Sequence, residues 1–151
     1  MNNISELLGK TLESINLIRD ENYCHSDISD KDVVKIEFVT QTGEKYKLYH
    51  PQDYSEIVYV EDICGDLNDL IGEPILLAEE VAHEGEEELP PVEKVKLQLK
   101  RSVDPYYARE SATWTFYKLG TRKGGVTIRW LGESNGYYSE SVSFTQVQNN
   151  D

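Results

Sequence analysis

Alternating apolar and polar positions dominate the chain, and this period of two predicts strands. Residues 34–38 and 46–48 alternate between apolar and charged side chains on either side of the turn sequence QTG. A three-residue turn with Gly43 in the left-handed conformation would pair Thr40 with Glu44. This hairpin register gathers one apolar face, made of Val34, Ile36, Phe38, Tyr46, Leu48 and His50.

Further strands are predicted along the rest of the chain, at residues 11–18, 57–60, 75–78, 95–99, 113–117 and 126–130. Near the C-terminus, the turn Ser134-Asn135-Gly136 predicts a second hairpin, in which Glu133 pairs with Tyr137. That register would collect Val126, Ile128, Trp130, Val142 and Phe144 on one face. We also expect Trp114 to lie on the core face with Trp130.

Two short stretches predict helices instead. Residues 4–8 form one, which Gly9 would stop. Residues 61–72 form the other, because Ile63, Leu67, Leu70 and Ile71 recur at helical spacing before Gly72 and Pro74. Residues 20–32 are predicted to be a loop, and the acidic, proline-containing residues 83–91 a mobile loop. The chain is therefore expected to be a single domain, residues 1–151, mainly β (α+β), built of antiparallel β-hairpins with one or two short helices.

Charge changes this picture most between residues 48 and 91, which hold thirteen carboxylates and no lysine or arginine. The net charge is −13, and residues 91–151 reverse the sign with nine cations against six acids. A folded acidic surface projects a negative potential, which disfavours direct contact with nucleic acid and favours a protein with a cationic surface. The expected contact residues are Glu61, Asp62, Asp66, Asp69, Glu79, Glu80, Glu86, Glu87 and Glu88. The alternative is that the acids only keep a small protein soluble.

Two tyrosines extend this candidate surface. Tyr137 and Tyr138 follow the Asn-Gly turn, so at least one is expected to be exposed. Exposed tyrosines are common at protein interfaces. The pattern favours no particular oligomeric state.

Compartment and chemistry are bounded by what the sequence contains. Cys24 and Cys64 make no disulfide framework, and the start MNNISELLGK has neither a basic nor an apolar run. We therefore expect no signal peptide, no membrane segment, and a cytoplasmic protein with reduced thiols.

Candidate metal ligands are few. Glu61, Asp62, Asp66 and Asp69 could attract a divalent cation, but their spacing lacks the calcium-loop pattern, and a solvated helix face explains them better. His50, Asp53 and Cys64 have the residue types of a zinc or nucleophile site without its spacing. We expect no cofactor and no catalytic residue. A metal-dependent hydrolase, a nucleotide-binding protein and a virion or assembly component stay open as alternatives.

Two blocks carry a resemblance to known proteins. They are VYVEDICGDLNDLIGEPILLAEE, residues 58–80, and ATWTFYKLGTRKGGVTIRWLGESNGYYSESVSF, residues 112–144. With the stretch GEKYKLYHPQD around His50, they resemble an uncharacterised domain-of-unknown-function family that is widespread in bacteriophage and prophage genomes. The resemblance implies a phage accessory protein in a bacterial host, where it would meet host proteins, and it implies no activity.

Overall fold

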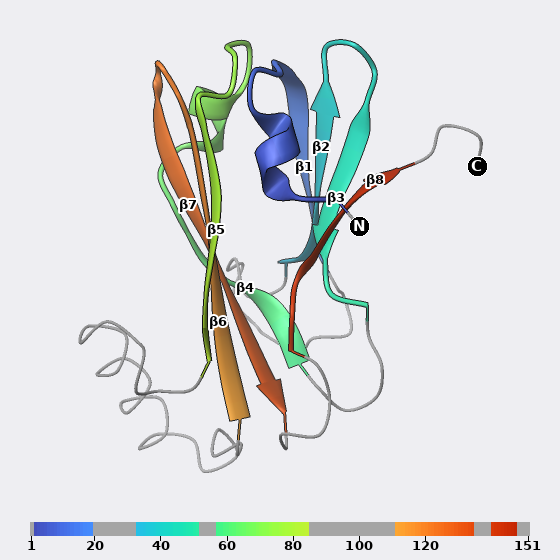
Figure 1. Cartoon of the computed structure of the whole chain (residues 1–151), viewed down its shortest axis with the longest axis vertical. Helices are drawn as coiled ribbons and strands as arrows, with labels where there is room; N and C mark the ends of the chain where they lie inside the picture. The colour runs from blue at the N-terminus through green and yellow to red at the C-terminus, as the bar shows by residue number, and fades with distance from the viewer. Residues whose placement is uncertain (1, 20–32, 52–56, 85–110, 135–139, 148–151) are drawn as a thin grey trace.

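Eight strands form two antiparallel sheets that face each other across an apolar core in the computed structural model (Figure 1), which describes residues 2–19, 33–51, 57–84, 111–134 and 140–147. The first sheet has the order β1-β2-β3-β8, with β1 at Leu12–Arg19, β2 at Val33–Thr40, β3 at Lys45–Tyr49 and β8 at Ser143–Val147. The second has the order β4-β7-β6-β5, with β4 at Ile57–Cys64, β7 at Gly124–Ser134, β6 at Ser111–Thr121 and β5 at Leu77–Glu84. Two 3-10 turns, η1 at Ile4–Leu7 and η3 at Leu67–Leu70, complete the described elements. The prediction of a mainly β domain with short helices is confirmed.

The β2–β3 hairpin forms in the predicted register. Gly43 has a φ of 90°, and the Thr40 N–H donates to the Glu44 carbonyl at 2.9 Å. The buried face differs at two positions, because Val33 rather than Val34 is fully buried and His50 is only half-buried. The β1–β2 register shifts between Ile18 and Arg19, which pair with Lys35 and Val33. This irregularity reverses the alternation at the start of β2, so Val33 faces the core in place of Val34.

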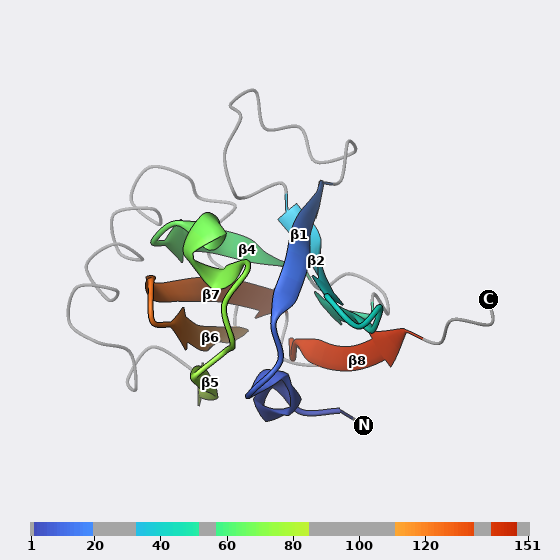
Figure 2. The ribbon, with the colours of Figure 1, turned by 90° about the horizontal axis from the view of Figure 1, so that it is seen from above.

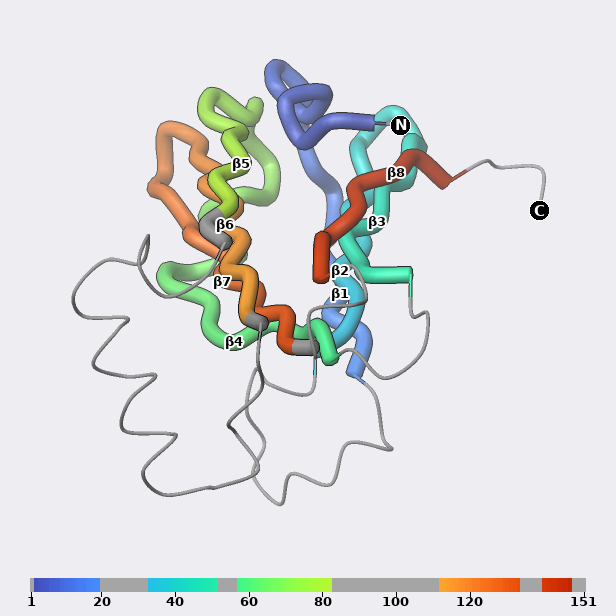
Figure 3. Tube along the Cα trace, turned by 60° about the horizontal axis from the view of Figure 1, so that its bottom comes forward, coloured from blue at the N-terminus to red at the C-terminus, as the bar shows by residue number. Residues whose placement is uncertain are grey.

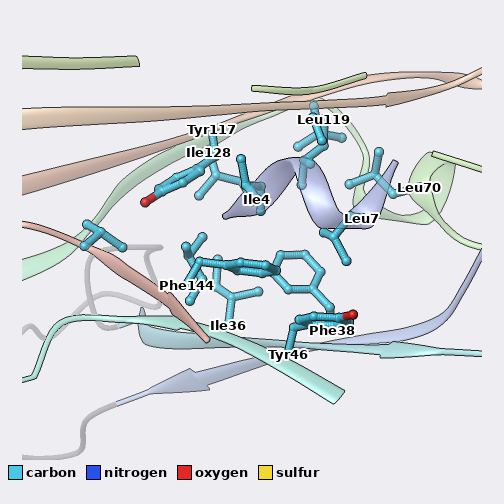
Figure 4. Packing of buried hydrophobic residues seen from close by; sticks show 14 of the residues in the cluster. Ile4, Leu7, Ile36, Phe38, Tyr46, Leu70, Tyr117, Leu119, Ile128 and Phe144 are labelled. Atoms are coloured by element: carbon cyan, nitrogen blue, oxygen red, sulfur yellow. The ribbon is translucent and has the colours of Figure 1, made fainter. Parts of the chain in front are cut away.

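Apolar side chains from both sheets meet in the core (Figure 4). Tyr46 and Phe144 stack with ring centroids 5.2 Å apart, and Phe38 meets Phe144 edge-on at 6.4 Å. From the opposite sheet, Tyr117 and Ile128 enter the same cluster. Burial of this apolar surface is the main force that holds the two sheets together.

The turn η1 closes one side of this core. Ile4 and Leu7 are buried between the sheets, and Asn3 caps the turn by accepting a hydrogen bond from the Ser5 N–H. Gly9, with a φ of 82°, ends the predicted helical segment. Seen from above, η1 lies between the edge strands β5 and β8 (Figure 2). The tube view shows the two sheets on either side of this N-terminal segment (Figure 3).

The predicted helix at residues 61–72 is wrong over most of its length. Residues 61–64 continue strand β4, and only Leu67–Leu70 coil into a 3-10 turn. The register of β4 against β7 shifts between Val60 and Asp62, so Glu61 is an extra residue. This bulge lets Val60 and Ile63 both face the core although they are three residues apart. A separation of three residues is also typical of apolar positions on one face of a helix.

The predicted hairpin between residues 126 and 144 is also wrong. Strand β8 pairs with β3, with Phe144 opposite Leu48, so the chain leaves β7 and crosses to the other sheet. Val142 and Phe144 still enter the core that contains Trp130, from the opposite side. Alternation fixes which side chains face inward but does not identify the neighbouring strand.

Trp114 does not share the core face with Trp130. In the β6–β7 register, Thr115 lies opposite Trp130, and Trp114 lies opposite Leu131 on the other face of the sheet. There Trp114 belongs to a second buried cluster with Tyr59, Ala112 and Leu131. Both faces of the second sheet therefore carry apolar side chains.

Strand β5 differs from its predicted bounds. It begins at Leu77 and runs to Glu84, so the first two residues of the predicted loop at 83–91 belong to a strand instead. The predicted loop at 20–32, the remaining residues 85–91 and the predicted strand at 95–99 lie outside the described residues.

Candidate partner-binding surface

Glu61 and Asp62, two of the predicted contact residues, are held by one arginine. Arg129 projects from β7, and its Nη2 lies 2.7 Å from Glu61 Oε2 and 3.1 Å from Asp62 Oδ2. The side chains of Arg129 and Glu61 are each 9% exposed, whereas that of Asp62 is 40% exposed. The β4 bulge brings both carboxylates to one guanidinium, because it inserts Glu61 beside Asp62.

The aromatic ring of Trp114 lies beneath this ion pair. The Arg129 guanidinium carbon is 5.8 Å from the centroid of the ring. A cation at this distance is attracted by the negative face of the indole. Glu61 therefore belongs to a buried structural network and offers little charge to a partner.

Asp66 lies beside η3 as its N-cap, Asp69 lies within η3, and each residue accepts a hydrogen bond from within the domain. Asp66 caps the turn and accepts a hydrogen bond from the Asn68 N–H at 2.9 Å. Asp69 is half-buried, and its backbone carbonyl accepts a hydrogen bond from the Thr121 hydroxyl. Of these two predicted contact residues, only Asp66 is exposed.

The β6–β7 turn places two cations against this acidic segment. Arg122 Nη2 lies 2.9 Å from Glu73 Oε1, and Lys123 Nζ donates to the Ile71 carbonyl at 2.8 Å. The charge of Glu44, which follows the β2–β3 turn, is balanced in a similar way, because Lys10 Nζ lies 2.8 Å from Glu44 Oε1. This hydrogen bond raises the pKa of Lys10 and lowers the pKa of Glu44.

Glu79 and Glu80 occupy a different setting, on the edge strand β5. Glu79 lies opposite Lys118 and Glu80 opposite Tyr117, so the two carboxylates leave the strand on opposite faces. Both are exposed. Glu80 also accepts a 2.8 Å hydrogen bond from the Tyr117 hydroxyl, and burial raises the pKa of that tyrosine well above its usual range.

Exposed leucines adjoin these acids. Leu76 is 67% exposed and Leu77 is 40% exposed, immediately before β5 and at its first position. Leu8, 48% exposed, precedes Gly9, whose N–H donates to the Ile75 carbonyl at 2.8 Å. The sequence predicts a strand at Leu76 and Leu77 but not their exposure, which depends on β5 lying at the edge of the sheet.

The other candidate sites are not assembled in the described part of the chain. His50 follows β3 and its Nδ1 lies 2.6 Å from the Ser141 carbonyl, whereas Cys64 ends β4 in the other sheet and donates to Asp62. Among the described residues, no three His, Cys, Asp or Glu side chains come together as metal ligands. Asp53, Tyr137, Tyr138 and Glu86–Glu88 lie outside those residues.

Comparison with known proteins places the chain in a family without assigning a function. No curated protein and no solved structure matches it. Within the described residues, no helix is long and apolar enough to cross a membrane. The model of a domain of unknown function, DUF7448, matches residues 5–144. This match spans nearly the entire sequence, and the chain therefore belongs to the DUF7448 family.

Proposed function

We propose that this protein is a non-enzymatic binding module that uses exposed carboxylates to contact a cationic surface of another protein. The observation that carries the proposal is strand β5, where Glu79 and Glu80 are both exposed beside the exposed Leu76 and Leu77. Carboxylates steer a cationic partner, and adjacent apolar surface supplies contact energy once the partner has docked.

The distribution of the other acids narrows the proposal. Glu61, Asp62 and Glu73 each lie within 3.1 Å of an arginine, so their charges are largely balanced within the domain. Among the described side chains, no cation lies within ion-pair distance of the two acids of β5, although Lys118 lies opposite Glu79. We assign the partner contact to Glu79 and Glu80 first, and to the exposed Asp66 second.

The resemblance of residues 58–80 and 112–144 to phage and prophage proteins supports a host setting. We infer that the protein acts in the bacterial cytoplasm as a phage accessory factor. Its partner would be a host or defence protein whose cationic groove normally receives phosphates, since carboxylates on a rigid strand can imitate that charge.

Salt dependence tests the proposal. The immobilised protein would capture host proteins from a bacterial lysate at 50 mM NaCl. At this ionic strength the Debye length is about 14 Å, so charges on the two proteins still attract each other. The affinity of each identified partner is then measured between 50 and 500 mM NaCl. We expect it to weaken at least about tenfold, because exposed charges are screened.

A matched pair of variants separates this surface from net charge. Glu79→Gln should weaken partner binding, whereas Glu13→Gln removes the same charge from an exposed position on β1 and should leave binding almost unchanged. An affinity that is insensitive to both salt and Glu79→Gln would contradict the proposed function.

A further inference from the structure

We propose that Leu8, Leu76 and Leu77 form an apolar docking surface where η1 meets β5, and that its partner is a cationic amphipathic α-helix of another protein. This inference rests on the proposed function and specifies which part of the partner is recognised. The three side chains are between 40% and 67% exposed, and among the residues that the structure describes no other large hydrophobic side chain is exposed to this extent. Large apolar side chains gathered at one place on a surface commonly mark an interaction site.

Backbone hydrogen bonds bring the leucines to one junction. The Gly9 N–H donates to the Ile75 carbonyl at 2.8 Å, so Leu8 and Leu76 directly adjoin two bonded residues. The Leu76 N–H donates in turn to the Gly120 carbonyl at 2.8 Å, and Ile75 itself is buried in the core. The exposed leucines are therefore presented by a fixed backbone, which reduces the entropy that is lost when a partner docks.

Side chains rather than backbone groups are available to a partner at this junction. The turn η1 packs along β5, and the Ile75 N–H and carbonyl are bonded to Lys10 and Gly9. An α-helix satisfies its own backbone hydrogen bonds, so it can dock through side chains alone. Apolar residues at positions i, i+3, i+4 and i+7 of such a helix would form the stripe that covers the leucines.

The charges beside the leucines favour a cationic helix. Glu6 lies in η1, Glu79 and Glu80 follow the leucines along β5, and all three acids are exposed. Among the described side chains, no cation lies within ion-pair distance of any of them, although Lys118 lies opposite Glu79. Lysines or arginines that flank the apolar stripe would meet these carboxylates, whereas an acidic helix would be repelled.

A second copy of the chain fits this surface poorly. The described elements are strands and two 3-10 turns, so the described part of a second copy offers no α-helical stripe. Symmetric contact between two such surfaces would also bring Glu79 and Glu80 of both copies together. A stable dimer buries about 800 Å² on each partner, far more than three partly exposed leucines provide. The surface suits contact with a short segment of a partner.

Peptide binding tests the recognition of a helix. The probe is the labelled peptide KALKKLLKKLAKLLK, whose leucines fall on one helical face, and fluorescence anisotropy with the full-length protein at 50 mM NaCl gives its affinity. One control, KLKLKLAKALKLKLK, has the same composition but alternates lysine and leucine with the period of a strand. The other, EALEELLEELAELLE, keeps the helical stripe and reverses the charge. We expect the probe to bind at least about tenfold more tightly than either control.

Variants of the protein locate the binding surface. Leu8→Ser with Leu76→Ser should weaken binding of the probe about tenfold, because two exposed apolar anchors are lost. Val39→Ser makes a similar change at a half-buried position of β2 in the other sheet and should leave the affinity unchanged. Circular dichroism and thermal unfolding check that the variants are folded.

A second pair of changes tests the charges and is independent of the leucines. Glu6→Gln with Glu80→Gln should weaken binding roughly fivefold, from two exposed ion pairs with the peptide. Glutamine at position 80 keeps an acceptor for the Tyr117 hydroxyl, so the core contact is retained. Glu13→Gln on β1 removes an equal charge elsewhere and should have little effect.

The outcomes are distinct. Binding of the probe that both control peptides lose, and that the leucine variants weaken, supports the proposal. Equal binding of the alternating peptide, failure of every peptide to bind, or leucine variants without effect would overturn it. In each of those cases the salt-dependent capture of a partner and Glu79→Gln still decide the proposed function separately. A dimer in sedimentation that Leu8→Ser with Leu76→Ser dissociates would assign the surface to a second copy and also overturn the proposal.

Discussion

Arg129 supplies the charge that allows Glu61 to be buried on the outer face of the second sheet. Both side chains are 9% exposed, so removing the arginine leaves a carboxylate in the interior without this cation. We expect Arg129→Met to lower the free energy of unfolding by about 3–5 kcal/mol. Urea denaturation followed by tryptophan fluorescence measures the change.

A second arginine pair is the control for this prediction. Arg122 pairs with Glu73 at 2.9 Å, but its side chain is 77% exposed. Arg122→Met should therefore change the free energy of unfolding by no more than about 1 kcal/mol. Replacing Arg129 and Glu61 together with apolar residues should recover much of the lost stability. Equal effects of the two arginine variants would show that burial does not govern the Arg129 pair.

Tyr117 makes stability fall at alkaline pH. Burial and the nearby Glu80 carboxylate raise the pKa of Tyr117 in the folded protein above its value of about 10 in the unfolded chain. Above pH 10 the unfolded chain releases a proton that the folded protein keeps, so this contribution is fully present below pH 10 and is lost as pH rises. The free energy of unfolding should fall by up to about 1.4 kcal/mol per pH unit from this group alone.

Comparison of the wild type with Tyr117→Phe isolates that contribution. The variant loses the hydrogen bond to Glu80 and is expected to be less stable at pH 8, by about 1 kcal/mol. Its stability should also decline less steeply between pH 10 and 11.5, since one raised tyrosine has been removed. Parallel curves for the two proteins over this range would refute the assignment. Urea midpoints at each pH provide the measurement.

Sequence patterns predict some of the strand pairings but not others. The β2–β3 hairpin could be predicted because the turn residues and the alternation agree on one register. The β4 bulge could not, since nothing in the run VYVEDIC marks the extra residue that lets Val60 and Ile63 share a face. For the candidate site, the sequence predicted the acids but not Arg129 as the partner of Glu61 and Asp62, which depends on that same bulge.

The crossing from β7 to β8 depends on a close backbone approach at Gly132. A Cβ at this position would lie 2.6 Å from the Glu140 carbonyl oxygen and 2.7 Å from the Glu140 Cβ. Gly132→Ala should therefore push the segment before β8 away from β7 and destabilise the fold by about 1–3 kcal/mol. It should also disturb the 2.8 Å bond from the Thr113 hydroxyl to Glu140.

Gly125 offers a control on the same strand. A Cβ there meets only the Leu119 carbonyl at 3.6 Å, an ordinary contact. Gly125→Ala should be neutral or slightly stabilising, because alanine reduces the conformational freedom of the unfolded chain. Thermal unfolding of the two variants side by side makes the comparison. A neutral Gly132→Ala would mean that the segment at Glu140 does not pack on β7 as described.

For the domain as a whole, composition and alternation were sufficient to predict a mainly β fold. They were not sufficient to predict the division into two sheets. Phe144 can complete an apolar face beside Trp130 in a hairpin or across a core from it, and the sequence pattern is the same in both cases. The charge pattern along the sequence likewise does not predict which acids are neutralised. Arg122 and Arg129, from the C-terminal third, pair with Glu73, Glu61 and Asp62 only in the folded domain.

The net charge of −13 gives the last prediction, which concerns ionic strength. Folding concentrates the excess acids, and their mutual repulsion opposes the compact state. The partly exposed pairs Lys10–Glu44 and Arg122–Glu73 act in the opposite direction but contribute at most about 1 kcal/mol each. Repulsion should dominate at low salt, where the screening length is about 20 Å or more, so the urea midpoint should rise between 20 and 300 mM NaCl.

Removing three exposed acids, with Glu13→Gln, Glu79→Gln and Glu80→Gln, should reduce this rise because less repulsion is left to screen. A midpoint that falls with added salt would instead mean that attraction within the ion pairs exceeds the repulsion, and that the acids of the folded domain are neutralised more completely than the exposed positions on β5 imply.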